Sequence, residues 1–587
     1  MNVSAAEVDD LSKDPTWLRL LHFEGSTSRV DSKDFFIHPK GHQNPKQELL
    51  ATIQAFTQAR VLENDRWSAA CAFPARYQFL QERGYVFPKV TCAEYDQWRK
   101  LLPIKSVSIV FSSYYPGNPA SIFGHTFLKL NFNENHQSKL TDYAVSFSAR
   151  ATDPVGVIYA IKGLLGGYQG FYEISPYYMK VNEYLHTESR DLWEYPILMS
   201  ETQMDRLLAH LWELSKKASY SYWFMSENCS FQLLALLDAT YGDTNFAKNA
   251  PTIVLPARTL TLLNEAQKLG KGSIRPSFKK QLLYRYNLLS RDEKETLSSN
   301  DTSARVLDVK IAVVRYQQLS VNEKPQERAK LTKELLPLIQ KRAALGTKTP
   351  DFSQEWINSM NAEDPLLAHD PHRLQLSSGS KNGQLLNRIE SRFGLHSPLD
   401  REDGMPHHSE VNYFSIAIEY TKRDFYLQKF RIIDILSLQP ANIASSGFSW
   451  RAGAGALRRL GYLNKTLPQV NFAGGYSLAP TQTLTLYALL GAESLIHLNK
   501  FKHTAIGNTL ELGLLISPTW SRLRAHLLAY AFYDYTRAKT WSSLSLQTQY
   551  DLNHKWEIGL SGETIFNTPY QLEKKSNQYL AMINRHF

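Results

Sequence analysis

The C-terminal part of the chain, from about residue 372 onward, alternates apolar and polar side chains with a period of two, and this pattern restricts it to β-strands. The alternation is clearest in residues 414–421, 509–516, 543–549 and 556–561. About twelve such segments can be counted, each near the nine to eleven residues that a tilted membrane strand requires. The pattern therefore predicts an antiparallel β-barrel of about twelve strands over residues 371–587.

A membrane barrel fits this alternation, and so does a soluble β-sandwich or lipocalin-like barrel. A soluble barrel turns its polar face outward, a membrane barrel turns its apolar face outward, and the two patterns look alike in sequence. The terminal Phe587 and the Trp and Tyr residues near segment ends favour the membrane barrel, although Arg585 departs from the apolar position expected close to a terminal aromatic. No stretch of about eighteen uncharged apolar residues occurs, so any membrane span must consist of strands. We expect an outer-membrane protein of a Gram-negative cell.

The N-terminal half has a mixed pattern, which predicts an α+β fold. Apolar residues at helical spacing run from about residue 16 to 100, and strands are expected at 106–111, 125–130 and 143–147. Helices are expected at 201–215 and 228–241, the second ending at Gly242. A charged helical stretch from 276 to 345 and a linker at 347–370 follow. The length of 587 residues requires several domains, and we expect three parts: 1–275, 276–370 and 371–587.

Several short segments carry further expectations. The polar residues 133–136 are expected to form the turn between the second and third strands, and the glycine cluster at 163–170 a flexible loop, a candidate lid. Val3-Ser4-Ala5 has the small-residue pattern that precedes a signal-peptidase cut, so the first residues are interpreted as the remnant of a removed export signal.

The charge and the histidines argue against nucleic-acid and metal binding. The net charge of +10 comes from scattered residues, with no basic run of the kind that binds nucleic acid, so no nucleic-acid partner is expected. The seventeen histidines show no close spacing with carboxylates or thiols, and His407-His408 is an isolated pair. The glycine cluster lacks dinucleotide-binding spacing. We therefore expect no metal and no cofactor.

The three cysteines are Cys71, Cys92 and Cys229. An odd number in an exported protein leaves one thiol over. Cys71 and Cys92 enclose a loop short enough for one disulfide, which would make Cys229 the free cysteine. The alternative is three unpaired cysteines that pack as small hydrophobic residues.

Cys229 and His125 are the candidate catalytic pair. Cys229 opens an apolar helix that Ser226 or Asn228 can cap, and the helix N-terminus is expected to lower the pKa of its thiol and to stabilise an oxyanion. His125 opens a strand after Gly124, which permits close backbone approach. Asp142, Ser146 or Ser148 on the next strand could orient the imidazole, but the register is open. The alternatives are a packing cysteine and a structural histidine.

The motifs Cys71-Ala72-Phe73-Pro74-Ala75-Arg76-Tyr77, Phe123 to Leu128, Gly163 to Gly170 followed by Pro176-Tyr177-Tyr178, and Asn228-Cys229-Ser230 resemble the Lnb N-terminal periplasmic domain family, over roughly residues 15–270. The characteristic histidine and Asn-Cys-Thr/Ser motif of that family correspond to His125 and Asn228-Cys229-Ser230. The following segment looks like the barrel that often accompanies this domain.

The resemblance implies a permuted papain-like domain of the NlpC type. It also implies a lipoprotein N-acyltransferase or a related hydrolase, in which Cys229 attacks an ester, His125 moves the proton and an acyl-thioester forms. The expected partners are outer-membrane lipids and a phospholipid or lipoprotein substrate. The presence of a full barrel leaves the acyl substrate open, and the oligomeric state is not predicted. The alternatives are an NlpC-like peptidoglycan amidase or peptidase, and a non-catalytic barrel with a periplasmic binding module.

Overall fold

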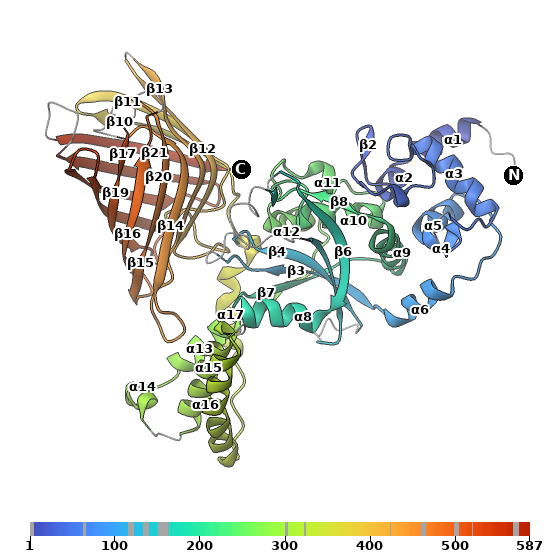
Figure 1. The fold of residues 1–587 in the computed structure, drawn as a ribbon, viewed down its shortest axis with the longest axis horizontal. Helices are drawn as coiled ribbons and strands as arrows, with labels where there is room; N and C mark the ends of the chain where they lie inside the picture. The colour runs from blue at the N-terminus through green and yellow to red at the C-terminus, as the bar shows by residue number, and fades with distance from the viewer. Residues whose placement is uncertain are drawn as a thin grey trace. The chain divides into compact units, whose positions relative to one another are not determined.

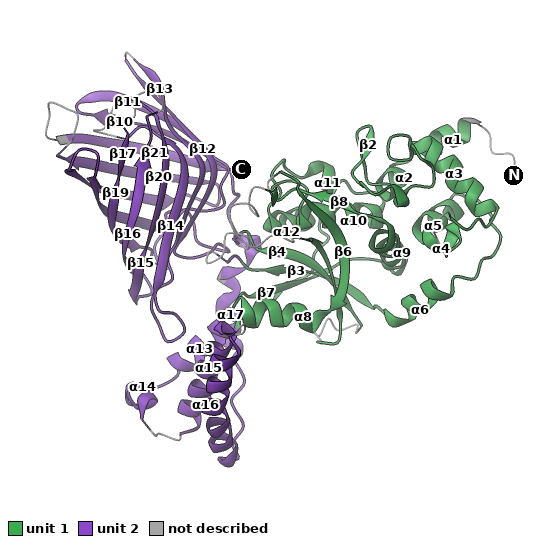
Figure 2. Ribbon diagram, in the orientation of Figure 1, with its two compact units in different colours: residues 1–113, 123–277 green, residues 114–122, 278–587 purple. Residues whose placement is uncertain are grey.

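The computed structural model describes residues 5–62, 66–115, 122–132, 140–150, 162–163, 165–299, 303–321, 324–422, 424–459, 465–497, 504–518, 520–567 and 575–587. The chain forms two compact units (Figure 2): Met1–Ser113 with Phe123–Ser277, and Tyr114–Ile122 with Phe278–Phe587. The helices that follow residue 278 therefore group with the barrel. The predicted turn at 133–136 lies outside the described residues.

The first unit begins with a group of helices, as the apolar spacing predicted (Figure 1). They are α1 (Ala5–Ser12), α2 (Pro15–Leu20), α3 (Pro45–Thr57), α4 (Ala69–Ala72), α5 (Pro74–Glu82) and α6 (Ala93–Leu101), with a short hairpin of β1 (Phe23–Glu24) and β2 (Thr27–Ser28) and the 3-10 turn η1 (Lys33–Phe35). Proline occupies the first turn of α2, α3 and α5, where its missing N–H costs nothing.

A disulfide between Cys71 and Cys92 joins α4 to the start of α6. This confirms the pairing considered from the sequence. All three cysteines lie in the described part of the chain, and Cys229 is the free one.

The centre of the first unit is an antiparallel sheet that has seven strands among the described residues, in the order β8-β6-β5-β4-β3-β7-β9. The strands are β3 (Ser106–Ser112), β4 (His125–Asn131), β5 (Tyr143–Ala149), β6 (Tyr168–Pro176), β7 (Leu192–Ile197), β8 (Tyr220–Tyr222) and β9 (Ser273–Arg275). The glycine cluster was predicted to be a loop, but its last residues, Tyr168 to Gly170, start strand β6. At Gly170 the Phe147 ring packs 2.4 Å from the position that a Cβ atom would take, so a larger residue would collide with the ring. The prediction of a flexible lid is therefore wrong for residues 168–170.

The other helices described in this unit include α8 (Tyr177–Val181), the π-helical turn η2 (Asn182–Thr187), α9 (Glu201–Lys217), α10 (Cys229–Tyr241), α11 (Phe246–Asn249) and α12 (Pro256–Glu265). The predicted helices near 201 and 228 are confirmed. Ser200 and Gln203 form a capping box at the start of α9, and α10 ends at Gly242, whose φ of +81° belongs to the left-handed cap that glycine favours.

The second unit starts with α13 (Phe278–Asn287), α14 (Arg291–Glu295), η3 (Thr296–Ser298), α15 (Ala304–Ser320), α16 (Pro325–Ala344) and α17 (Gln354–Ser359), followed by the 3-10 turns η4 (Met360–Glu363) and η5 (Pro365–Leu367). Leu282, Val306 and Val309 from these helices pack with Ala444 of the barrel. Residues 347–370, which were expected to be a linker, contain the short helical elements α17, η4 and η5.

Residues 373–586 form a closed antiparallel barrel, with twelve strands in the described ranges, each paired with its sequence neighbour. This confirms the predicted barrel. The strands are β10 (Arg373–Lys381), β11 (Gln384–Arg392), β12 (Ser409–Thr421), β13 (Phe425–Ser437), β14 (Phe448–Leu457), β15 (Leu467–Thr481), β16 (Leu484–Leu495), β17 (Ala505–Ile516), β18 (Leu523–Asp534), β19 (Lys539–Asp551), β20 (Trp556–Phe566) and β21 (Lys575–His586). Pairing of β10 with β21 closes the barrel.

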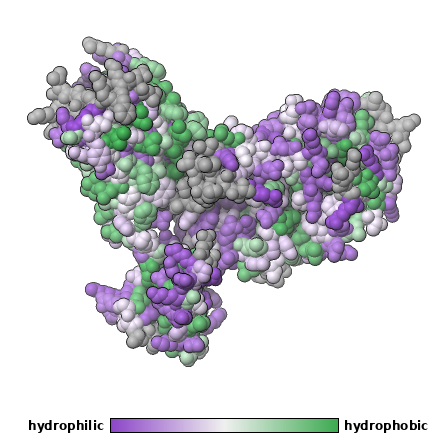
Figure 3. All heavy atoms as spheres, viewed as in Figure 1, coloured by the Kyte–Doolittle hydropathy of each residue, from purple (hydrophilic) through white to green (hydrophobic). Residues whose placement is uncertain are grey.

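The outer face of the barrel is the apolar one. On β17, Leu510 and Leu512 are 37% and 48% exposed, whereas Thr509 and Glu511 are buried inside. Hydrophobic residues gather over the outside of the barrel in Figure 3. A barrel with charged side chains buried inside and leucines exposed outside would be unfavourable in water, but this arrangement suits a surrounding lipid bilayer. This is the arrangement of an outer-membrane barrel.

No described helix is both long and apolar enough to cross a membrane.

Candidate active site and barrel interior

Asn228 fixes the start of helix α10 and places Cys229 as its first residue. The Asn228 Oδ1 atom accepts hydrogen bonds from the N–H groups of Ser230 (3.0 Å) and Phe231 (3.3 Å). Its Nδ2 atom donates to the carbonyls of Phe224 (3.0 Å) and Val254 (2.7 Å). Of the two caps predicted, Asn228 is therefore the one used. Its role is to position the cysteine.

Gly124 brings His125 to the start of strand β4. Its φ of +82° is strained for any L-residue, and a Cβ atom here would lie 2.6 Å from the Phe111 ring and 2.8 Å from the Ser112 carbonyl. The close approach predicted from the sequence is thus present. Ser112 pairs with His125 across the two strands, so β3 fixes the backbone position of the histidine.

The Cys229 thiol lies against the backbone that follows His125. The Ser230 Oγ lies 3.9 Å from Sγ, and the N–H and hydroxyl groups of Thr126 and Ser230 are near enough to the sulfur to stabilise its thiolate form. The two hydroxyls lie 3.3 Å apart. The structure therefore brings the helix start and the strand start together, with His125 one residue from the contact.

Tyr184, in the π-helical turn η2, adds an aromatic ring to the site. Its ring centroid lies 6.1 Å from that of His125, and its hydroxyl is near enough to interact electrostatically with Cys229. Lys180 and Arg190 both lie over the Tyr184 ring, at 5.8 and 4.9 Å from its centroid. A π-helical turn often occurs at functional sites.

Both candidate catalytic groups are neutral in this structure. The Cys229 side chain is buried, and burial raises the pKa of its thiol more than the hydrogen bonds from Thr126 and Ser230 lower it. Burial, together with the positive charges of Lys180 and Arg190, lowers the pKa of His125 to about 3. The pKa of the thiol is thus raised where the helix start was expected to lower it, because desolvation outweighs the hydrogen bonds that Thr126 and Ser230 offer.

Asp142 and Ser146 occupy different parts of strand β5. Tyr143 of β5 pairs with Leu130 of β4, and Asp142 lies beyond that pair. Leu130 is five residues from His125, which corresponds to about 16 Å at the usual strand rise. The Asp142 carboxylate faces Lys129 at 3.5 Å and accepts from the Phe132 N–H. The structure therefore places the Asp142 carboxylate with Lys129 rather than beside the imidazole.

Ser146 lies nearer the His125 end of the sheet, opposite Glu173 of β6. It shares a strand face with Ala144, which packs with Phe127 and Tyr184 in one core cluster. The Ser146 Oγ is buried and has no hydrogen-bond partner among the described residues. Ser148, the third predicted orienting group, lies two residues further along the same strand face, opposite Phe171 of β6. Of the three, only Asp142 is placed away from the imidazole.

Sequence reasoning missed four residues of this site: Thr126, Tyr184, Lys180 and Arg190. Thr126 could have been considered because it follows His125 directly. The other three come from a segment after β6 that carries no recognisable motif. Arg190 is held by the carbonyls of Ser112 (3.0 Å) and Ser113 (2.7 Å), next to the strand position that pairs with His125.

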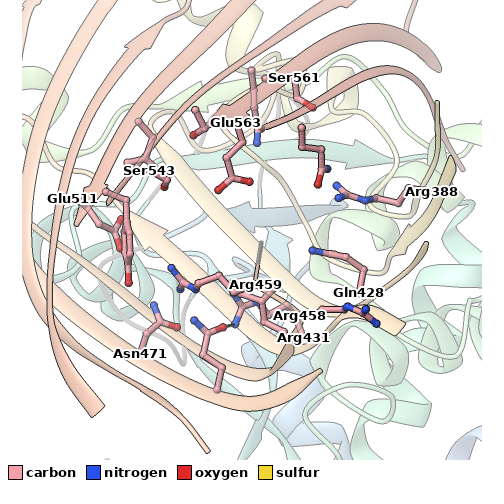
Figure 4. A pocket seen from close by; sticks show the side chains of 18 of the residues that line it. Arg388, Gln428, Arg431, Arg458, Arg459, Asn471, Glu511, Ser543, Ser561 and Glu563 are labelled. Carbon is pink, nitrogen blue, oxygen red and sulfur yellow. Dashed lines mark hydrogen bonds between the residues drawn. The ribbon is translucent and has the colours of Figure 1, made fainter. Parts of the chain in front are cut away.

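The barrel interior is polar and charged. A cavity of about 310 Å³ lies inside it, lined by both cations and carboxylates (Figure 4). Arg459 pairs with Glu493 at 2.5 Å, and Arg451 with Glu511 at 3.3 Å. These pairs satisfy charges that would otherwise be buried alone. The interior can accommodate small polar molecules, and its walls carry no free nucleophile of the cysteine type in the described strands.

Comparison with known families identifies a domain within the first unit. Residues 94–266 match the Lnb N-terminal periplasmic domain. The matched region contains both His125 and Cys229, and the match confirms the resemblance seen in the motifs. Residues 9–83 and 362–579 match two further models, each a domain of unknown function, DUF7843 and DUF7840. The chain is thus an outer-membrane barrel protein whose Lnb N-terminal domain is periplasmic.

The solved structures similar to parts of this chain include porins. The NanC porin is 7% identical, covers 36% of this chain and 100% of its own, and has a TM-score of 0.26. The KdgM porin is 8% identical, with 37% and 99% coverage and a TM-score of 0.23. The anion-selective porin from Comamonas acidovorans is 8% identical, with 37% and 98% coverage and a TM-score of 0.20. These scores are too low to support any functional inference. No curated protein matches the chain at a significant level.

Proposed function

We propose that the Lnb N-terminal domain is a cysteine-dependent acyltransferase or hydrolase that acts on lipid or lipoprotein substrates at the periplasmic face of the outer membrane. The observation that carries this proposal is that Cys229 lies beside Thr126, which stabilises the thiolate form of Cys229 and whose hydroxyl lies 3.3 Å from that of Ser230. It joins a cysteine at a helix start to the residue that follows a strand-opening histidine. A helix carrying the thiol against an antiparallel sheet carrying the imidazole is also the arrangement of papain-like domains, of which we propose this is a permuted member.

The first half of the reaction forms an acyl-thioester. His125 takes the thiol proton as the Cys229 sulfur attacks the ester carbonyl carbon, and a tetrahedral oxyanion forms. The N–H of Cys229, at the first helical position, has no acceptor within the helix and is placed to donate to that oxyanion. The carbon–oxygen bond then breaks, and His125 gives its proton to the leaving alcohol oxygen.

The second half transfers the acyl chain. An amine of a lipoprotein, or water in the hydrolase version, attacks the thioester carbonyl while His125 takes a proton from it. The carbon–sulfur bond breaks, and the sulfur recovers the proton. The product is an amide or a free fatty acid. Lys180 and Arg190 place positive charge beside the imidazole, which suits a donor with an anionic phosphate headgroup.

The neutral resting state shapes this mechanism. Because the thiol pKa is raised and the imidazole pKa is about 3, proton transfer must accompany attack rather than precede it. Ser146 is the group proposed to orient the imidazole, since its unpartnered Oγ lies on the appropriate face. Asn228 acts as a positioning residue through the helix cap.

The same neutrality favours a second candidate, a non-catalytic barrel with a periplasmic binding module. A thiol that is 4% exposed, with the Ser230 Oγ at 3.9 Å from its sulfur, is also what a packing cysteine looks like. The two candidates differ in whether Cys229 ever carries an acyl group. An NlpC-like peptidase would instead release muropeptides from purified peptidoglycan.

The test is intact-mass spectrometry of the full chain after incubation with phospholipid vesicles. We expect a mass increase of one acyl chain on Cys229 that hydroxylamine removes and that is absent in Cys229→Ala. His125→Gln should abolish the adduct, whereas His186→Gln, a histidine of the same turn as Tyr184, should retain it.

Cellular lipoproteins supply the second readout. In cells that depend on this protein, the Cys229→Ala copy should lower N-terminal acylation. If vesicle incubation leaves the wild-type mass unchanged and lipoprotein acylation does not differ between the copies, the enzymatic proposal fails and the binding module stands.

A further inference from the structure

Five metal-ligating side chains gather at one end of the barrel, where β10 begins and β21 ends. They come from four separate segments: His369 before β10, His396 and Asp400 in the loop between β11 and β12, Glu557 on β20, and His586 at the end of β21. All five are buried, with His369 the most exposed at 5%. Two trios, His369-His396-Asp400 and Asp400-Glu557-His586, have all their ligand atoms within 4.8 Å of one another.

The hydrogen bonds of two of the rings fix which nitrogen is available. The Nδ1 atoms of His369 and His586 both lie against the carbonyl oxygen of Asp370, at 2.8 and 3.1 Å. A carbonyl only accepts, so each Nδ1 carries the hydrogen. In a neutral ring Nε2 then holds a lone pair. Donation of the second ring nitrogen to a backbone carbonyl is the usual way in which proteins orient a metal-binding histidine.

These lone pairs point at other acceptors. The His369 Nε2 atom lies 3.1 Å from His396 Nδ1, and the His586 Nε2 atom lies 3.1 Å from the Glu557 carboxylate. If His396 donates its proton to His369, its buried Nε2 is left as an acceptor with no hydrogen-bond partner in the described structure. A cation among these atoms would instead bind the lone pairs of His369 Nε2 and His396 Nδ1, with the His396 hydrogen then on its Nε2. Tetrahedral Zn²⁺ with bonds of about 2.0–2.1 Å holds its ligand atoms about 3.3 Å apart.

The surrounding charge limits which cation fits. Arg373 donates to Asp400 Oδ1 at 2.8 Å, and Arg392 also bonds the same carboxylate. Glu557 accepts from Asn584 Nδ2 at 3.3 Å and lies 4.0 Å from Arg524. Because arginines already neutralise the carboxylates, Ca²⁺ and Mg²⁺, which depend on carboxylate charge, gain little here. Neutral imidazoles suit Zn²⁺ and other late first-row metals.

We propose that this cluster binds one Zn²⁺-type ion through His369 Nε2, His396 Nδ1 and Asp400, with Glu557 and His586, which form a second trio with Asp400, as further ligands. Arg373 pairs with His586 where β10 meets β21, so the ion would link the β11–β12 loop to the seam at which the barrel closes. The sequence analysis expected no metal because it looked for closely spaced ligands. These ligands are separated by up to 217 positions, from His369 to His586, and barrel closure alone brings them together.

The experiment uses the full chain in detergent, stripped with a chelator, titrated with Zn²⁺ alone, and washed before metal analysis. We expect one retained zinc per chain in the wild type and at least a tenfold weaker affinity in His369→Gln and His396→Gln. His372→Gln is the matched control, since His372 lies three residues from His369 but bonds Ser391 Oγ at 3.0 Å instead. It should retain the wild-type affinity.

Zinc-edge X-ray absorption of the wild type gives an independent readout. We expect nitrogen and oxygen ligands with imidazole scattering and no sulfur, because sulfur would place the ion at Cys229. Barrel folding of each variant is checked by heat-dependent mobility on a gel. Absence of retained zinc in the wild type, equal zinc in His372→Gln and His396→Gln, or a sulfur ligand would each overturn the proposal. If the variants do not fold, two measurements on the wild type test the proposal. It is supported by an absorption spectrum without sulfur ligands and by an unfolding temperature that rises with zinc, and it fails if either is missing. Neither readout involves acyl transfer.

Discussion

Replacement of Gly124 by alanine tests how the fold holds His125 in place. The φ of +82° disfavours any side chain, at a cost of about 1–2 kcal/mol. The new Cβ would also meet the Phe111 ring at 2.6 Å and the Ser112 carbonyl at 2.8 Å. Overpacking of this kind costs about 1–3 kcal/mol more. The free energy of unfolding of the first unit should therefore fall by about 2–5 kcal/mol in total.

Gly84→Ala separates the two contributions. Gly84 follows helix α5 with a φ of +86°, but nothing lies within 4 Å of the position that its Cβ would take. Its replacement carries only the backbone cost, about 1–2 kcal/mol. The difference between the two variants, about 1–3 kcal/mol, therefore measures the close contact beneath His125.

Cys229 provides the assay. It is the free cysteine and is buried in the native structure, so a bulky maleimide labels it when the first unit unfolds. With a urea slope of about 1–3 kcal/mol/M, Gly124→Ala should lower the labelling midpoint by roughly 1 M more than Gly84→Ala does. Equal midpoints for the two variants would refute the reasoning, since the contact with Phe111 and Ser112 would then carry no cost. A normal midpoint with lost acylation would show that only the histidine had moved.

Three further outcomes follow from the same structure. The rate at which iodoacetamide alkylates Cys229 should keep rising with pH beyond pH 9, because burial raises the thiol pKa from 9.0; a plateau between about pH 5 and 8 would instead indicate a preformed thiolate–imidazolium pair. The pKa of folded His125 is about 3 against an ordinary 6.5, so the unfolded chain takes up the proton first and the first unit should lose stability as the pH falls from 6.5 towards 3; by pulse proteolysis, His125→Gln should lose less over that range. Leu512→Arg, on the outer face of β17, should disfavour insertion into lipid vesicles by about 2–4 kcal/mol, whereas Glu511→Gln, on the inner face, should not; equal insertion would contradict the assigned orientation.

The pair Cys229 and His125 could be predicted because local sequence encodes each position. An Asn-Cys step before an apolar run specifies a capped helix start, and a glycine before a histidine specifies a tight entry into a strand. Their contact, through Thr126, depends on how α10 packs against β4. No local pattern encodes that packing, which is why Tyr184 and Arg190 were missed.

The ionisation state of the site could not be predicted either. A helix start argues for a lowered thiol pKa, but the size of the opposing desolvation depends on the number of atoms that cover the sulfur. That number is a property of the whole domain. The same holds for Asp142, since the β4–β5 register decides which end of the strand it faces.

The sequence by itself determined that residues beyond about 372 form alternating strands, that their number is near twelve, and that the chain carries one disulfide candidate and one spare thiol. Only the tertiary structure decided which face of the barrel points outward. Alternation has the same period whether leucine or glutamate faces the interior. Pairing of β10 with β21 closes the barrel and fixes the outward face of every strand at once. The same closure brings together histidines that lie far apart along the chain.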